Sequence, residues 1–285
     1  IIKNMNKYRI INRKTIFKEY YLFRIFSFLL KIFLVNLISI KSERNLNNYI
    51  SEIHLVIKGK GTQNILYNYY NTNPSEVIVN GISKGNTCQK TCDLDEEINN
   101  VTLKFTTSVE YCLFMFNHVF SIIEVDLSYF DASHVTNMFC MFQGCISLEK
   151  INFGNIDTSS VESIYGLFSD CTKLTTVDIS NFDTSKVLDM AGMFNNCKNL
   201  IYLNLSNFDV SKVTNMFKMF YSCSSLIYLN LYSFKITDSV NIEDILTETS
   251  LNTKYCINDA TTKEILFNNY RIVSNCSDIC FKYNI

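Results

Sequence analysis

The sequence predicts an α/β fold: a right-handed solenoid of 26-residue strand-plus-helix repeats with a parallel sheet and a β-rich N-terminal cap. Three observations predict it. The middle of the 285-residue chain repeats with a fixed period, one apolar pattern recurs where repeats meet, and alternating apolar and polar residues precede the array. A fixed period of about 20–50 residues is typical of proteins in which stacked repeats bury one another's apolar faces.

Four consecutive units align without a gap, and cysteines and aspartates recur in them every 26 residues. A fifth, weaker unit follows at 227–251. Four equal periods indicate four copies of one structural unit. The units are IEVDLSYFDASHVTNMFCMFQGCISL (123–148), EKINFGNIDTSSVESIYGLFSDCTKL (149–174), TTVDISNFDTSKVLDMAGMFNNCKNL (175–200) and IYLNLSNFDVSKVTNMFKMFYSCSSL (201–226).

Each boundary between units predicts a strand. It reads L-x-x-L-x-L-x-x-F, as in Leu200, Leu203, Leu205 and Phe208. Residues two apart share one face of a strand, so the apolar pair of each boundary points into the core. Stacking the units then aligns these strands in one parallel sheet.

The second half of each unit predicts a short helix. In the fourth unit, Val213, Met216, Phe220 and Cys223 are spaced by three, four and three residues, which places them on one helix face. A serine precedes each of these segments, where its hydroxyl can cap free backbone N–H groups. The four serines are Ser133, Ser159, Ser185 and Ser211.

The repeat motif resembles that of BspA-like leucine-rich-repeat surface proteins of bacteria and protists. NFDTSKVLDMAGMF and NFDVSKVTNMFKMF carry the resemblance most clearly, and it covers residues 108–251. It implies a cell-surface or secreted protein associated with adhesion and molecular recognition, with no catalytic residues to carry over. The second unit departs from the motif, with Gly154-Asn155-Ile156 in place of SNF and Ser163-Ile164-Tyr165 in place of TNM.

The N-terminal residues 1–41 predict a signal peptide or signal-anchor. They hold nine Lys or Arg and one acid, and the basic residues precede an apolar stretch at 20–40 that Arg24 and Lys31 interrupt. A basic segment followed by an apolar one is typical of export signals. We therefore expect a secreted or cell-surface protein that contacts the membrane only through this segment, if it is uncleaved. The remaining residues hold 17 basic and 26 acidic residues, a net charge of −9, which makes nucleic acid an unsuitable partner.

Two flanking modules complete the predicted organisation. Residues 42–107 contain EIHLVIKG, SEVIVNG and NNVTLKF, whose alternation predicts half-buried strands of an N-terminal cap. Residues 252–285 contain three cysteines and predict a C-terminal cap. Terminal caps are needed because an exposed repeat face is insoluble.

The outward positions of the predicted strands form a candidate binding face for a protein or glycan ligand. Tyrosines beside acids and amides suit recognition, because tyrosine gives contact area at low entropic cost. The alternative is that these residues only solubilise the sheet. The two outward columns are Glu124, Lys150, Thr176, Tyr202, Tyr228 and Asp126, Asn152, Asp178, Asn204, Asn230.

The eleven cysteines divide into two kinds. Cys145, Cys171, Cys197 and Cys223 are expected to pack as reduced, core-facing residues, although bridges between repeats are an alternative. The other seven are disulfide candidates, since exported proteins form disulfides. They are Cys88, Cys92, Cys112, Cys140, Cys256, Cys276 and Cys280. Cys140 is expected on the exposed side of its helix, where it is free, bridged to a second chain or paired with a cysteine of the ladder.

No metal, cofactor or catalytic site is predicted. The column Asp131, Asp157, Asp183 and Asp209 could suggest calcium, but an Asp before x-Ser more often bonds to its own backbone. The two C-x3-C pairs are a weak zinc signal. The histidines lie in no recognisable nucleophile motif, and the eight glycines form no phosphate-binding loop. The sequence therefore predicts a non-catalytic binding or adhesion protein, with a self-associating structural coat protein as the alternative.

Three asparagines lie in glycosylation acceptor motifs: Asn100, Asn204 and Asn275. Asn204 belongs to the candidate binding face, so a glycan on it would obstruct that face.

Overall fold

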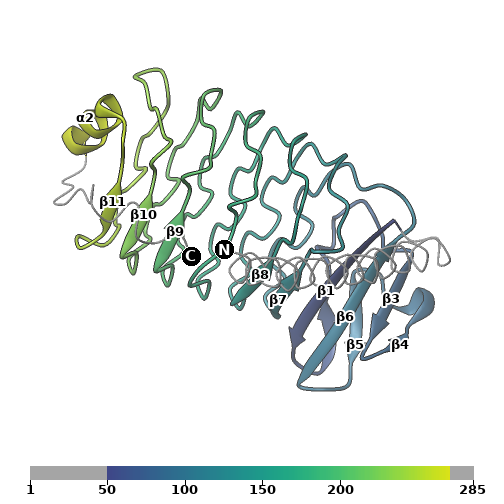
Figure 1. Ribbon diagram of the computed structural model, residues 1–285. Helices are drawn as coiled ribbons and strands as arrows, with labels where there is room; N and C mark the ends of the chain where they lie inside the picture. Colours follow the sequence, from purple (N-terminus) through teal and green to yellow (C-terminus); the bar gives the residue numbers. More distant parts are fainter. Residues whose placement is uncertain (1–49, 270–285) are drawn as a thin grey trace, which may run out of the picture. The chain divides into compact units, whose positions relative to one another are not determined.

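The computed structural model of the protein describes residues 50–269. The predicted export segment, Asn275, Cys276 and Cys280 therefore lie outside the described residues. Eleven strands in three sheets dominate the described part of the chain. Figure 1 shows the repeats following one another, with β9, β10 and β11 side by side near the C-terminal end.

The largest sheet joins the N-terminal region to the first two repeats. It has six strands in the order β4-β3-β6-β1-β7-β8, so β1 lies between β6 and β7 and pairs antiparallel with both. Only β7 and β8 are parallel to each other. The strands are β1 (Ser51–Lys58), β3 (Glu76–Val79), β4 (Ile82–Ser83), β6 (Ile98–Phe105), β7 (Ile122–Asp126) and β8 (Lys150–Asn152).

Two smaller sheets and two helices complete the elements. β2 (Gly61–Asn64) pairs antiparallel with β5 (Thr91–Leu94), and a 3-10 helix, η1, covers Gly85–Thr87. β9 (Tyr202–Asn204), β10 (Tyr228–Asn230) and β11 (Lys254–Cys256) form a parallel three-stranded sheet, followed by the helix α2 (Ala260–Asn269).

The predicted α/β solenoid with one helix in each repeat is wrong. Within residues 50–269 the single α-helix is α2, which follows the repeats, and the predicted helical segments are successions of turns. The predicted single parallel sheet is also wrong. The six-stranded sheet ends at β8, and in the third repeat Thr176 makes only an isolated bridge to Tyr202.

Left-handed residues explain why the predicted helices do not form. The predicted helical segment of each repeat has two residues with positive φ, four positions apart, and a right-handed helix cannot contain this conformation. Three of these eight positions are glycine and two are Asp or Asn, the residue types that favour positive φ, whereas Cys140, Lys218 and Ser222 gave no such signal. The pairs are Cys140 and Gly144, Gly166 and Asp170, Gly192 and Asn196, and Lys218 and Ser222.

Alternate backbone N–H groups of these turns bond to the next repeat, and those between them bond three residues back within their own turn. The N–H groups of Met138, Cys140 and Phe142 donate to carbonyls 25 residues later, at 3.0, 2.8 and 3.0 Å. These lateral bonds satisfy groups that a helix would bond four residues back. Bonds between repeats and local bonds to the residue three positions back therefore together replace the bonds of a helix.

The spacing of apolar residues still places the predicted side chains in the core. Phe116, Phe142, Phe168, Phe194 and Phe220 are fully buried and form an inner stack with ring-centroid distances of 5.4, 5.7, 5.5 and 6.0 Å. Turns and helices can both point such residues inward, so the three-four-three spacing did not distinguish them.

The cysteine ladder is buried beside this stack. Cys145, Cys171, Cys197 and Cys223 are free thiols, as expected, and each donates to a phenylalanine carbonyl 29 residues earlier at 3.1–3.2 Å. Burial raises the pKa of Cys145 and Cys223 to about 12. The four residues therefore act as small, neutral core side chains.

The recurring aspartates form turns, as their local chemistry predicts. The backbone N–H of the serine two residues later donates to the carboxylate of Asp131, Asp157, Asp183 and Asp209 at 2.9–3.1 Å. The prediction that these serines cap helices is wrong, because no helix follows them. The pair stabilises a corner of each repeat.

Candidate functional site

A hollow of about 420 Å³ lies on the outer face of β6, β1, β7 and β8. It forms there because these strands alternate: Ile53, Leu55 and Ile57 are buried, whereas the residues between them face outward. The register aligns the outward residues in two rows across the four strands. The rows are Thr102, His54, Asp126, Asn152 and Asn100, Val56, Glu124, Lys150.

Pairs across β7 and β8 hold two acids of the hollow in place. Lys150 Nζ lies 3.5 Å from a carboxylate oxygen of Glu124, and the pair is largely exposed. Asn152 Nδ2 donates to Asp126 Oδ1 at 3.0 Å, and the backbone N–H of Ser128 donates to the same oxygen at 2.8 Å. Both carboxylates keep unused acceptor positions, because a carboxylate offers about four.

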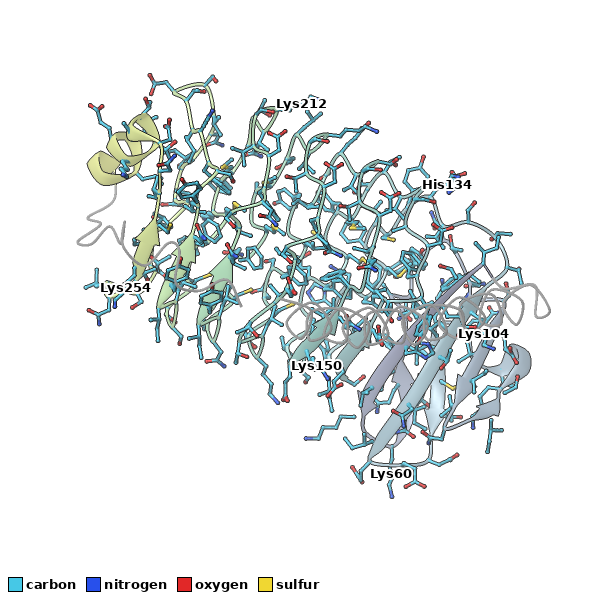
Figure 2. The ribbon with its side chains drawn as sticks, viewed as in Figure 1. Lys60, Lys104, His134, Lys150, Lys212 and Lys254 are labelled. Atoms are coloured by element: carbon cyan, nitrogen blue, oxygen red, sulfur yellow. A yellow bond between two sulfur atoms is a disulfide. The ribbon has the colours of Figure 1, made fainter. Side chains whose placement is uncertain are left out.

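His54 connects the hollow to the neighbouring strands. Its Nδ1 is 3.0 Å from the Thr102 hydroxyl, and its Nε2 is 3.7 Å from the Glu52 carboxylate. Its ring meets the ring of Tyr129 edge to face at 5.5 Å. Lys104, on the same face of β6, lies 3.8 Å from Glu52 and from Glu76. Figure 2 labels Lys104 and Lys150, two lysines of this polar face.

Of the predicted binding face, the structure brings together in the hollow only the first two residues of each column. Glu124, Asp126, Lys150 and Asn152 line the hollow. The acids and amides of the second column are used in turns, since the N–H two residues later donates to the side-chain oxygen of Asp178, Asn204 and Asn230 at 3.0–3.1 Å. Asp126 and Asn152 make the same turn, with N–H donors at 2.8 and 3.0 Å, so the whole column has a structural role and only these two residues also line the hollow.

The first column also changes character toward the C-terminal end. Thr176 is exposed, whereas Tyr202 is half-buried and stacks on Tyr228 with ring centroids 4.9 Å apart. The expectation that Tyr228 and Asn230 are exposed is wrong, because each is only 5% exposed. The two tyrosines cannot both offer open contact area, so the hollow is the better candidate site.

Four outward-facing residues of the hollow were not predicted as ligand-binding residues, although one of them, Asn100, was predicted as a glycosylation acceptor: His54, Val56, Asn100 and Thr102. The alternation in EIHLVIKG and NNVTLKF predicted that they face outward from strands. It did not predict that β1 pairs with β7, because alternation fixes the face of a strand and not its neighbour. The pairing of β1 with β7 is what completes the hollow.

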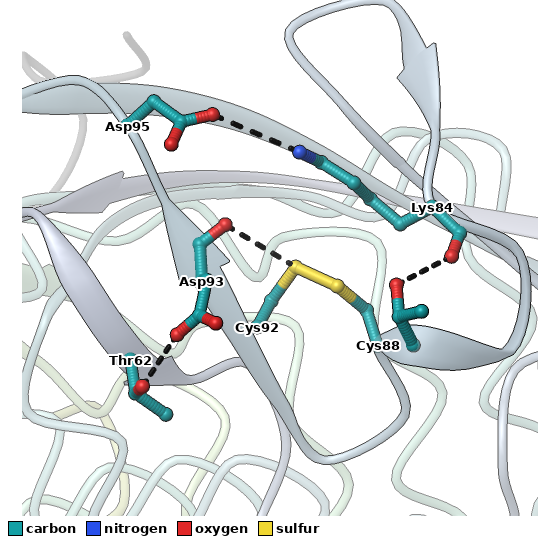
Figure 3. Close-up of a disulfide and its surroundings, with 7 residues drawn as sticks. Thr62, Lys84, Cys88, Cys92, Asp93 and Asp95 are labelled. Atoms are coloured by element: carbon teal, nitrogen blue, oxygen red, sulfur yellow. Dashed lines mark hydrogen bonds and ion pairs between the residues drawn. A yellow bond between two sulfur atoms is a disulfide. The ribbon is translucent and has the colours of Figure 1, made fainter.

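The disulfide candidates fall in different environments. Cys88 and Cys92 are joined by a disulfide near the Lys84–Asp95 ion pair (Figure 3). Cys256 is also disulfide-bonded, whereas Cys112 and Cys140 are buried free thiols. The prediction that Cys140 is exposed on a helix is wrong, because it lies in a left-handed turn beneath the surface.

Within residues 50–269, no group of three or more His, Cys, Asp or Glu side chains is placed to hold a metal ion. In the same range, no helix is both long enough and apolar enough to cross a membrane. Of the glycosylation candidates, Asn100 is exposed at the rim of the hollow, and Asn204 is half-buried.

A sequence-family model described as "Mycoplasma protein of unknown function, DUF285" matches the chain in three overlapping segments, residues 87–176, 110–230 and 148–259. Together the segments span more than half of the chain. No curated protein and no solved structure matches it.

Proposed function

The chain belongs to the DUF285 family of proteins of unknown function, and we propose that it is a non-catalytic binding protein that recognises a protein or glycan on a cell or matrix surface. The hollow on β6, β1, β7 and β8 carries the proposal. Its volume of about 420 Å³ lies within the range of about 300–1,000 Å³ that is typical of ligand sites.

The arrangement of the lining groups supports ligand binding. Glu124 and Asp126 are held by Lys150 and Asn152, and His54 is held by Thr102. Side chains fixed by their neighbours lose little freedom when a ligand binds. The proposal places the protein outside the cytoplasm. The basic and apolar N-terminal sequence and the resemblance of the repeats to BspA-like surface proteins support this location, and the Cys88–Cys92 disulfide is compatible with it.

Self-association through an intermolecular Cys140 disulfide is not supported, because this thiol is only 2% exposed. The binding proposal is therefore the one that the geometry favours.

Two matched ion pairs test the proposal. Both Glu124–Lys150 and Glu149–Lys173 are exposed ion pairs of the repeats, but only the first lines the hollow. Removing either exposed pair should change stability by less than about 1 kcal/mol. We expect binding of the labelled full chain to cells and extracellular matrix to fall roughly tenfold with Glu124→Ala/Lys150→Ala. The control Glu149→Ala/Lys173→Ala should bind normally, and equal binding by both variants would refute the site.

A further inference from the structure

We infer that the hollow binds an uncharged sugar, as a mono- or disaccharide unit of a glycan. The inference rests on the proposed function and names the ligand class of the same site.

The size of the hollow favours a small ligand over the surface of a folded protein. About 420 Å³ is near the lower end of the range for small-ligand sites. A stable protein interface instead needs about 800 Å² on each partner, which is far more than four strand positions supply. A saccharide unit of one or two rings fits a site of this scale.

The lining combines an apolar centre with a polar rim. Val56 lies between Asn100 and Glu124 in its row, and its side chain is half-buried on the outer face. Leu55, Val101 and Val125 also line the hollow, although their side chains are buried on the opposite face. A sugar ring has the same division, with C–H groups on its faces and hydroxyls around its edge. Ring packing over Val56 would place those hydroxyls among the polar side chains.

The polar rim can satisfy groups that both donate and accept hydrogen bonds. Glu124 and Asp126 have acceptor positions left after their existing contacts, and a carboxylate that accepts from a hydroxyl makes a strong hydrogen bond. The Asn100 side chain is exposed and, when it carries no glycan, offers both a donor and an acceptor. Hydroxyl groups of a sugar are the ligand groups that such a mixed rim can match.

The charges favour an uncharged sugar over an acidic one. The hollow contains two carboxylates and one ammonium, and Lys150 is already paired with Glu124. Residues 42–285 also carry a net charge of −9. A carboxylated or sulfated sugar would therefore be repelled by Asp126 without gaining an unpaired cation.

A glycan array with neutral, sialylated and sulfated members tests the inference on the full chain. Val56→Trp fills the hollow from a strand position that suits an aromatic residue. The matched control is Ile98→Trp, an exposed position of β6 that does not line the hollow. We expect the wild type and Ile98→Trp to bind neutral glycans, and Val56→Trp to lose at least roughly tenfold in binding.

The outcomes separate the two proposals. The inference is overturned if the chain binds only sialylated or sulfated glycans, if Val56→Trp binds as well as wild type, or if no glycan binds. If no glycan binds, but the wild type binds cells and Glu124→Ala/Lys150→Ala does not, the proposed function holds and the ligand is a protein. If every variant of the hollow binds glycans and cells as well as the wild type does, both proposals are refuted.

Discussion

Replacing Gly192 with alanine distinguishes left-handed turns from the helices that the apolar spacing predicts. Gly192 has φ +61°, and a Cβ added there would meet nothing closer than 3.8 Å. In a helix, glycine is less stable than alanine by about 0.5–1 kcal/mol, so the substitution would stabilise the protein. In a left-handed turn, alanine instead adds about 1–2 kcal/mol of backbone strain. The two structures therefore predict opposite signs for the change in the free energy of unfolding.

Gly166 is the matched position one repeat earlier. Its φ is +59°, but a Cβ there would lie 2.9 Å from the sulfur of Cys140, which is closer than real Cβ atoms approach. Overpacking a tight site costs about 1–3 kcal/mol. Gly166→Ala should therefore destabilise the protein by about 2–5 kcal/mol in total. This is the sum of the overpacking cost and a backbone strain equal to that expected at Gly192.

Urea unfolding of the full chain, followed by far-UV circular dichroism, measures both effects. Combining Gly166→Ala with Cys140→Ala should recover the part due to the sulfur contact, so that the remaining loss approaches that of Gly192→Ala. This double-mutant cycle isolates the contact from the strain. A stabilising Gly192→Ala would refute the left-handed turns, and additive losses for Gly166→Ala and Cys140→Ala would refute the sulfur contact.

Two further predictions concern titratable groups. The hydroxyl of Ser180 (2.7 Å) and then its N–H (3.0 Å) hold the pKa of Asp178 below its usual range. This stabilisation is present above the unfolded pKa of about 3.9 and is lost as pH falls through the lower folded pKa. Ser180→Ala should raise the pKa of Asp178 toward its usual value in an NMR titration, and an unchanged pKa would contradict the assignment. Because burial raises the thiol pKa to about 12 in Cys145 and Cys223, both should resist alkylation at a pH of about 8 in the native protein and react after unfolding. Rapid native labelling of either residue, located by mass spectrometry, would show that the ladder is not buried.

The sequence predicted which side chains face the core better than it predicted the backbone that carries them. The buried phenylalanine and cysteine columns follow from the 26-residue period, and the Asp–Ser turns follow from local chemistry. The turns between them were not predicted, because Cys140, Lys218 and Ser222 adopt positive φ without being glycine. Hydrogen bonds to the next repeat hold these residues in place.

The candidate site was only half predictable for a different reason. Glu124 and Lys150 lie one period apart, so the repeat itself places them side by side. His54 and Asn100 lie outside the repeats and reach the same face through antiparallel pairing over long sequence separations. No periodicity encodes that pairing.

The lateral hydrogen bonds between repeats also have a mechanical consequence. Each described repeat is held mainly by its two neighbours, and bonds such as Gly166 N–H to the Ala191 carbonyl (2.8 Å) connect one repeat to the next. Tension on the chain ends would therefore load one boundary between repeats at a time. A released unit of 26 residues would itself span about 90 Å when fully extended. Under force, such a protein would yield in steps and absorb work at each one.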